Sequence, residues 1–277
     1  MVIFGHKAPL TAVIGLFIIA LNVVVAIAGP WLAPYSETQT VGKTWATISA
    51  TSWLGTDQIG RDMLTRLIYG ARLTIGIALV TTILSFAIGI TLGLVAAVTG
   101  RWIDAVLSRT VDIVMSVPLL IWALIILSIF GQTLTSLVLT IAFLDSSRVY
   151  RLARALGMNL ASLDFVEVAR LRGEGIWWVV WREILPNAAA PLMSEFGLRF
   201  CFNFLFIAAL SFIGLGVPLP YADWGGMVRD NITSLKLGRA AALYPAAAIA
   251  LLTIGINLVV DWFLSIDARP SGAQAEM

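Results

Sequence analysis

The chain has 277 residues, of which 59% are hydrophobic and only 12% are charged, and its formal net charge is +2. Soluble domains carry roughly 25% charged residues, so this composition excludes an ordinary soluble protein with a polar surface. The small net charge, without a basic cluster among aromatic residues, argues against nucleic-acid binding. Because Cys201 is the single cysteine, a disulfide framework within the chain is also excluded. We therefore predict an all-α membrane protein surrounded by lipid.

Six apolar stretches reach the length of about 20 residues that a helix needs to cross the hydrocarbon core. They are residues 9–32, 73–98, 104–131, 133–157, 188–216 and 241–266. The first stretch follows Lys7 and could be mistaken for a signal peptide, but it is longer than the apolar region of such a peptide. We interpret it as a retained span. The fourth stretch is interrupted by charged residues in its second half, namely Asp145, Arg148, Arg151 and Arg154.

Six spans place both termini on one side of the membrane, and the distribution of Lys and Arg indicates which side is cytoplasmic. With the N-terminus inside, ten basic residues lie in or next to the cytoplasm, against seven in the outside segments 34–72 and 217–240. This bias predicts that both termini are cytoplasmic. The predicted spans divide the chain into two parts. Residues 1–72 hold the first span and an extracytoplasmic segment, and residues 73–277 form a core of five spans.

Catalytic chemistry is scarce in this sequence. His6 is the only histidine, which rules out a histidine-based triad and a multi-histidine metal site. Gly42-Lys43-Thr44 resembles the end of a phosphate-binding loop, but Glu37 stands where that pattern requires glycine. Asn231-Ile232-Thr233 matches the glycosylation pattern, and so short a match is common by chance. We therefore predict no catalytic site, no metal site and no cofactor in this chain.

Acidic residues inside predicted spans are candidate functional sites, but three of them have a base at helical spacing. The pairs are Arg109 with Asp112, Asp145 with Arg148, and Glu195 with Arg199. Residues three or four apart face one another on a helix. We therefore predict structural ion pairs at these positions, with substrate contact as the alternative.

Gly89 and Gly93 form a G-x-x-x-G step in the second predicted span. Small residues at this spacing let two membrane helices approach closely. The step predicts close packing within this chain, with an interface to another subunit as the alternative.

The polar segment 158–187 has the pattern of two short helices joined by a sharp bend. Asp164 and Glu167 predict an N-cap and a capping box for the first helix. Gly173 suits the left-handed residue that ends such a helix. The bend would therefore lie immediately after residue 172.

The second short helix of this segment carries Trp177, Trp181 and Ile184, which we expect on one face, and Pro186 is expected to end it. Two short helices at a bend could form a knob that inserts into a groove on a soluble partner. Alternatively, they could form an interfacial linker whose tryptophans lie at the lipid headgroups. The residues alone leave both interpretations open.

The segment resembles the EAA loop of binding-protein-dependent ABC import permeases. In that loop, Glu-Ala-Ala is followed after three residues by glycine and later by Ile-x-Leu-Pro or a close variant. This chain has Glu167-Val168-Ala169, then Gly173, then Ile184-Leu185-Pro186. Val168 replaces the usual alanine, and Glu174 stands where a small residue is common.

More of the chain is similar to one branch of that family, the C-type membrane subunit of dipeptide, oligopeptide and nickel permeases. The similarity lies in Trp53 to Asp62 with Tyr69-Gly70-Ala71-Arg72, in Ser211 to Val217 with Trp224-Gly225, and in Asp104, Arg109, Asp112 and Pro118. The C-terminal region fits more loosely, since Val260 replaces a usual glycine and Ala268 a usual proline.

The resemblance implies a polytopic type I ABC importer permease fold with short cytoplasmic coupling helices, in the bacterial inner membrane. It implies that a homologous membrane subunit supplies the other half of the pore. Two cytoplasmic ATPase subunits would carry ATP and Mg²⁺, and an extracytoplasmic binding protein would deliver the substrate. The residues implied in ATPase coupling are Glu167, Val168, Ala169, Arg170, Arg172, Gly173, Ile184, Leu185 and Pro186. Among them, Ala169 would enter the ATPase groove, and Arg170 and Arg172 would pair with acids at its rim.

The same resemblance implies di- or oligopeptides as substrates, with nickel, glutathione or opine-like compounds as the alternative. A secondary transporter would need its own coupling-ion site, and the sequence shows no unpaired acidic cluster for one. Co-purification of ATPase subunits would separate these two classes.

Overall fold

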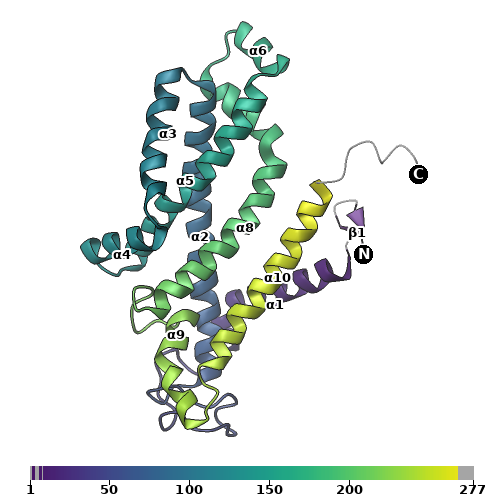
Figure 1. The fold of residues 1–277 in the computed structure, drawn as a ribbon. Helices are drawn as coiled ribbons and strands as arrows, with labels where there is room; N and C mark the ends of the chain where they lie inside the picture. Colours follow the sequence, from purple (N-terminus) through teal and green to yellow (C-terminus); the bar gives the residue numbers. More distant parts are fainter. Residues whose placement is uncertain (1, 4–5, 8, 268–277) are drawn as a thin grey trace. The chain divides into compact units, whose positions relative to one another are not determined.

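The computed structural model describes residues 2–3, 6–7 and 9–267. Five long helices carry most of the fold: α1 (Leu10–Leu32), α2 (Met63–Val98), α5 (Leu134–Ala161), α8 (Leu185–Phe212) and α10 (Leu243–Asp267). The remaining helices are α3 (Arg101–Ser116), α4 (Leu119–Phe130), α6 (Asp164–Leu171), α7 (Ile176–Trp178), the π-helix η1 (Val179–Ile184), α9 (Trp224–Asn231) and the 3-10 helix η2 (Ile232–Leu237). The two strands β1 (Val2–Ile3) and β2 (His6–Lys7) form a small antiparallel hairpin at the start. The class is therefore all-α, as predicted (Figure 1).

Four helical stretches are long and apolar enough to cross a membrane. They are Leu10–Leu32, Met63–Val98, Ile176–Phe212 and Leu243–Ile266, and the bent pair of α3 and α4 would be a fifth. Helix α5 has 28 residues but is not among them. Every stretch of 18 residues within it contains at least three charged side chains. The predicted count of six spans is therefore not confirmed at the fourth position.

The third predicted span, residues 104–131, is not one straight helix. Helices α3 and α4 meet at an angle of 90°, and Val117 between them is extended, with φ −107° and ψ 137°. Pro118 explains the break, because a residue before proline is disfavoured in helical geometry. The indole Nε1 of Trp122 donates to the carbonyl of Val114 over 3.0 Å, which links the two helices across the bend.

Contacts between Cα atoms divide the chain into two compact units. The first consists of residues 1–79, 132–137 and 197–277, and the second of residues 80–131 and 138–196. In the first unit, α1 packs against α10 at two glycines. A Cβ atom on Gly15 would come within 2.7 Å of the carbonyl oxygen of Gly255, so this approach requires glycine.

In the second unit, α2 and α5 pack closely through the predicted G-x-x-x-G step. A Cβ atom on Gly89 would lie 2.6 Å from the Cβ of Val149, and one on Gly93 would lie 2.7 Å from the carbonyl oxygen of Tyr150. Both distances are too short for any larger residue. The step therefore serves packing within the chain, which was the first of the two interpretations.

Candidate functional site

The bend in the 158–187 loop is a Schellman motif that ends α6. Gly173 has φ +84°, the left-handed geometry in which a side chain is strained. Its N–H donates to the carbonyl of Arg170 over 2.9 Å, and the N–H of Glu174 donates to the carbonyl of Ala169 over 3.2 Å. This pair of bonds satisfies two of the carbonyls that a helix leaves free at its C-terminus. The predicted role of Gly173 as the terminating residue is confirmed.

The predicted capping box at the start of α6 is wrong. Leu163, with extended backbone, is the N-cap residue, and no side chain caps the helix. Asp164 already has helical geometry and, with Glu167, lies in the first turn. There the two carboxylates are favoured by the positive end of the helix dipole.

The second part of the loop runs through α7 and the six-residue π-helix η1 directly into α8. Ile184 is fully buried, whereas Trp177 and Trp181 are exposed. The expectation that these three side chains share one face is therefore wrong. A π-helix has a wider turn than an α-helix, and this shifts the residues after Val179 relative to those before it.

Pro186 does not end this second helix, in contrast to the prediction. Leu185 keeps helical geometry, and its N–H donates to the carbonyl of Val180, five residues back. Proline normally clashes with the carbonyl four residues before it. The wider π-turn makes room for Pro186, and Asn187 Nδ2 donates to the carbonyl of Glu183 over 2.6 Å. The loop is therefore continuous with α8.

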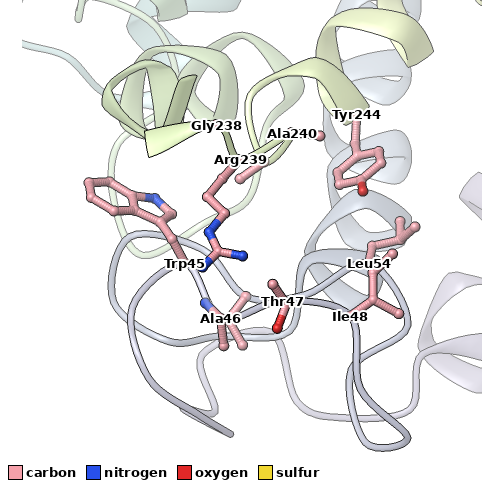
Figure 2. A pocket seen from close by; sticks show the side chains of 11 residues that line it. Trp45, Ala46, Thr47, Ile48, Leu54, Gly238, Arg239, Ala240 and Tyr244 are labelled. Carbon is pink, nitrogen blue, oxygen red and sulfur yellow. The ribbon is translucent and has the colours of Figure 1, made fainter. Parts of the chain in front are cut away.

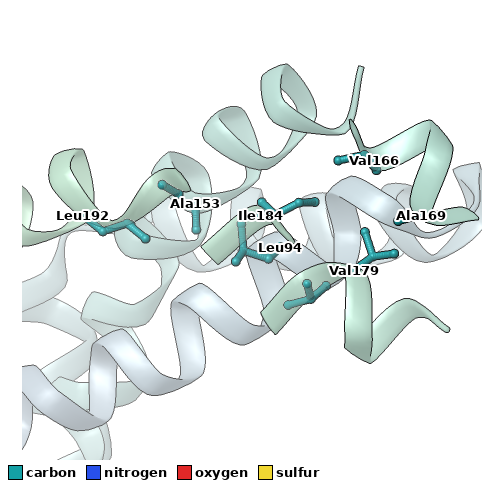
Figure 3. Packing of buried hydrophobic residues seen from close by; sticks show 9 residues of the cluster. Leu94, Ala153, Val166, Ala169, Val179, Ile184 and Leu192 are labelled. Atoms are coloured by element: carbon teal, nitrogen blue, oxygen red, sulfur yellow. The ribbon is translucent and has the colours of Figure 1, made fainter. Parts of the chain in front are cut away.

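The inner face of the loop packs into a closed apolar cluster with α2, α5 and the start of α8 (Figure 3). The cluster consists of Leu94, Ala153, Val166, Ala169, Val179, Val180, Ile184, Ala188 and Leu192. Ala169 has no exposed surface, so the expected insertion of its side chain into a partner's groove is wrong. The spacing of Val166 and Ala169 turns both toward the cluster. The loop is thereby fixed to the ends of two long helices.

The outer face of the loop carries large exposed apolar side chains among exposed charged ones. Leu171 is 81% exposed and Trp177 is 60% exposed. The exposed apolar side chains of this face, hereafter the outer apolar face, are Leu163, Val168, Leu171, Ile176, Trp177 and Trp181. Figure 1 shows α6 projecting beyond the ends of α3 and α5. A group of large apolar side chains at a projecting end indicates contact with a protein or with lipid headgroups.

Two arginines of the loop make contacts within this chain, one to the end of α2 and one within the loop. Arg170 Nη2 lies 3.4 Å from the carbonyl oxygen of Val98 at the end of α2. Arg172 Nη2 lies 3.6 Å from Glu183 Oε1, and its guanidinium is 5.4 Å from the centre of the Trp178 ring. The contacts of Arg172 join the two arms of the bend, and that of Arg170 joins α6 to α2. Pairing of either arginine with a partner's acids stays a prediction.

The ion pairs expected within the spans are partly replaced by pairs between helices. Asp112 of α3 bonds Arg151 of α5 at 2.8 Å; within the described part of the chain it makes no ion pair with Arg109. Packing of α3 against α5 supplies this partner, which helical spacing could not reveal. Asp145 is fully buried and accepts from Ser85 Oγ of α2 over 3.2 Å. Its predicted pairing with Arg148 stays a prediction, as does that of Glu195 with Arg199.

Before α2, residues 34–62 fold into a compact segment held by Asp57. Its Oδ2 accepts from Arg61 Nε at 2.6 Å, and its Oδ1 accepts from the backbone N–H groups of Ile59 and Arg61 at 2.9 Å. Asp62 Oδ2 accepts from the N–H and Oγ1 of Thr65, which caps the start of α2. Asp57, Arg61 and Asp62 are buried. Their hydrogen bonds serve to shape the 34–62 segment.

Helix α9 joins this segment to α2 through buried side chains. The indole of Trp224 donates to the carbonyl of Leu67 over 3.0 Å, and its backbone N–H donates to Thr74 Oγ1 over 3.1 Å. Asp223 caps the helix, with its Oδ2 accepting from the N–H of Gly226 at 3.0 Å. Burial raises the pKa of the Asp223 carboxyl above its ordinary value.

Asn231 at the end of α9 binds the 34–62 segment. Its Oδ1 accepts from Trp45 Nε1 over 3.1 Å and from the N–H of Gln58 over 3.0 Å, and its Nδ2 donates to the carbonyl of Met227 over 2.9 Å. The side chain is buried. These bonds occupy the amide, so the glycosylation pattern at this position has no accessible acceptor in the folded chain.

A pocket of about 160 Å³ opens between the 34–62 segment and the residues after η2. Figure 2 shows Arg239 extending toward the segment, with Trp45 and Tyr244 among the surrounding side chains. No sequence pattern indicated this pocket, because its walls come from residues 45–56 and residues 238–244, which lie far apart in the sequence.

Helices of spanning length and a bent pair define a multi-pass α-helical membrane protein. The chain belongs to the family of binding-protein-dependent transport system inner membrane components, which matches residues 89–269. The N-terminal transmembrane domain of oligopeptide transport permease C matches residues 11–45. The predicted family and its C-type branch are therefore confirmed.

Individual relatives agree with this assignment. The chain is 34% identical to the dipeptide transport system permease protein DppC of Alkalihalophilus pseudofirmus, over 90% of this chain and 83% of the relative. It is 35% identical to the di/tripeptide transport system permease protein DppC of Pseudomonas aeruginosa, over 93% and 87%. The glutathione transport system permease protein GsiD of Pectobacterium atrosepticum is 28% identical, over 89% and 82%.

A solved structure shares the fold. The crystal structure of an amino acid ABC transporter with histidines aligns with a TM-score of 0.55 and 22% identity, over 73% of this chain and 94% of the other. The predicted fold class, that of an ABC importer permease, is therefore confirmed.

Proposed function

We propose that this permease subunit transmits movement from cytoplasmic ATPase subunits to half of a substrate pathway for di- or oligopeptides. The 158–187 loop carries the proposal. Its inner face is fixed to α2, α5 and α8, while its outer apolar face is open. A partner that binds the outer face and moves would therefore move the helix ends with it. Rigid-body motion of this kind supports alternating access.

The proposed partners divide the work. ATP and Mg²⁺ belong to two ATPase subunits, and this chain would hold no cofactor and catalyse no reaction. A homologous membrane subunit would complete the pathway, and an extracytoplasmic binding protein would deliver the substrate. Family membership supports all of these partners. The outer apolar face supports docking into an ATPase groove, and the pocket beside Arg239 supports docking of the binding protein on the side of the 34–62 segment.

The proposed orientation places both termini and the 158–187 loop in the cytoplasm of a bacterial inner membrane. The excess of Lys and Arg in and beside that loop supports it. Because α2 has the length and composition of a span, the residues before Met63 and those after Val98 would lie on opposite sides. The 34–62 segment would then be extracytoplasmic.

The peptide class rests on relatives named for dipeptide and di/tripeptide transport. Glutathione, itself a small peptide, is the second candidate, because one relative is named for it. Uptake of labelled dipeptides, tripeptides and glutathione by the reconstituted complex would separate the two. Inhibition of labelled dipeptide uptake by unlabelled peptides but not by glutathione would support di- or oligopeptides as the substrate class.

The coupling role is tested by placing a charge on the outer apolar face. We expect Leu171→Glu to leave membrane insertion intact and to abolish ATP-dependent uptake, because a buried unpaired carboxylate opposes docking. The matched control is Leu237→Glu in η2, which is also exposed, at 61%, but lies far from the loop in sequence. ATPase subunits that still co-purify with Leu171→Glu and drive normal uptake would contradict the proposal.

A further inference from the structure

One face of α3 carries a polar ladder that faces α5. Asp104, Ser108 and Asp112 are spaced by four residues and therefore share a face. Asp104 Oδ2 accepts from Arg154 Nη2 at 2.6 Å, and Ser108 Oγ lies 2.9 Å from the hydroxyl of Tyr150. Asp112 Oδ1 accepts from Arg151 Nη2 at 2.8 Å. The residues of this ladder belong neither to the 158–187 loop nor to the 34–62 segment.

The ladder borders a pocket of about 290 Å³. Its walls are Ser108, Val111, Asp112, Tyr150, Arg151 and Arg154. Two of these side chains are half open even though they are paired: that of Asp112 is 51% exposed and that of Arg151 is 54% exposed. The pocket therefore presents one carboxylate and one guanidinium side by side.

The position of Asp112 along α3 determines its depth in the membrane. Helices α3 and α4 together have the length and composition of one broken span. Asp112 lies eleven residues after Arg101, which at 1.5 Å per residue is about 16 Å along the axis. The hydrocarbon core is about 30 Å thick, and the arginines of α3 and α5 were assigned to the cytoplasmic side, so Asp112 would lie in the cytoplasmic half of the membrane. Charged groups at that depth face the bundle interior or water, because exposure to lipid is costly.

We propose that the Asp112–Arg151 pair lines the water-filled path of the substrate and interacts with the charged ends of a passing zwitterionic peptide. This rests on the proposed transport function. Asp112 can accept hydrogen bonds from a peptide ammonium group, and Arg151 can donate to a peptide carboxylate. Because the two side chains neutralise each other when no peptide is present, neither is left as an isolated charge.

Thiol accessibility tests the location. In a Cys201→Ser background, Asp112→Cys, Arg151→Cys and Ser108→Cys are each reconstituted with the partner subunits and treated with a charged, membrane-impermeant thiosulfonate. Ser108→Cys probes the same pocket without removing a charge. The controls are Ile113→Cys, exposed but on another side of α3, and Val149→Cys, which is buried. We expect modification at positions 108, 112 and 151 in the assembled complex, slowed by peptide, and none at the controls.

Two outcomes would overturn the proposal. Cysteines at 108, 112 and 151 that react in the isolated subunit but not in the complex would show that the partner subunit covers the pair. Reaction at the same rate with and without peptide, during active uptake, would show a water-filled crevice off the path. Failure of the proposed transport function is distinguishable, because the unaltered complex would then take up no peptide whatever the labelling pattern.

Charge selectivity supplies a second measurement. The neutral double variant Asp112→Asn with Arg151→Gln removes both charges, with an isosteric change at Asp112 and a shorter side chain at Arg151. We expect the ratio of uptake between free dipeptides and the same dipeptides blocked at both ends to change by about fivefold, the effect of losing one close charge contact in water. An unchanged ratio with unchanged uptake would also overturn the proposal.

Discussion

Ala169 accepts a hydrogen bond from the N–H of Glu174 across the bend after α6, at 3.2 Å, while its methyl group is completely buried in the cluster below. One residue thereby fixes both the shape of the loop and its attachment to the long helices. The bend and the core are therefore linked at this one residue. Substitutions that separate the two effects are therefore the most informative.

Gly173→Ala should weaken the bend without any steric clash. A Cβ at this position would meet no atom within 4 Å, so the cost is that of the left-handed backbone alone, about 1 kcal/mol. Gly173→Asn should cost less, because asparagine tolerates this geometry. We expect uptake per ATP hydrolysed to fall in the order Gly, Asn, Ala. Equal ratios for all three in proteoliposomes would show that the bend's geometry is not limiting.

Ala169→Leu should disrupt the cluster under the loop. The added carbons have no free volume in a closed core, and overpacking of this kind costs about 1–3 kcal/mol. The adjacent Val168→Leu is the matched control, because Val168 is exposed and a change there costs within about 0.5 kcal/mol. Thermal unfolding of the two variants in nanodiscs provides the comparison. A lower unfolding temperature for Val168→Leu than for Ala169→Leu would contradict the assigned orientation of α6.

The sequence revealed those features that local chemistry determines. Gly173 was predictable because a chain that reverses after a helix needs a left-handed residue. Gly89 and Gly93 were predictable because close helix packing needs small residues at that spacing. Pro118 was a valid local signal for the break in the third span, but the apolar run continued across it and hid the bend.

Features that depend on packing were not predictable in this way. The π-turn of η1 changes which residues face inward, and no residue pattern marked it. Packing against Leu94 and Ala153 on neighbouring helices favours the rotation of η1 about its axis that buries Ile184. Asp112 likewise obtains its partner from another helix. Helical spacing could suggest Arg109 only because it describes a single helix.

Asn231→Ala should destabilise the junction between α9 and the 34–62 segment. It removes the acceptor for two buried N–H groups, those of Trp45 and Gln58, and each unsatisfied group costs about 1–3 kcal/mol. Thr233→Ala is the control, because it removes the glycosylation pattern while leaving those bonds in place. We expect a lower unfolding temperature only for Asn231→Ala. An equal effect of both variants would point to a role of the pattern itself.

Asp223→Asn should remove a pH dependence of stability. Burial raises the pKa of Asp223 above the ordinary value of 3.8, so the folded state binds this proton more tightly than the unfolded state. The resulting stabilisation is complete below pH 3.8 and is lost as the pH rises through the raised pKa. Asparagine has no such proton and can still accept from the N–H of Gly226.

The measurement is the difference in unfolding temperature between Asp223→Asn and the unaltered protein, taken in nanodiscs from pH 4 to pH 8. We expect this difference to shift in favour of the variant as the pH rises, because the unaltered protein must bury a charge that the variant lacks. Asp230→Asn, a neighbouring acid paired with Arg229 at 3.0 Å, provides the comparison. A difference for Asp223→Asn that is constant with pH, or that shifts the other way, would show that hydrogen bonding and not burial controls this carboxyl.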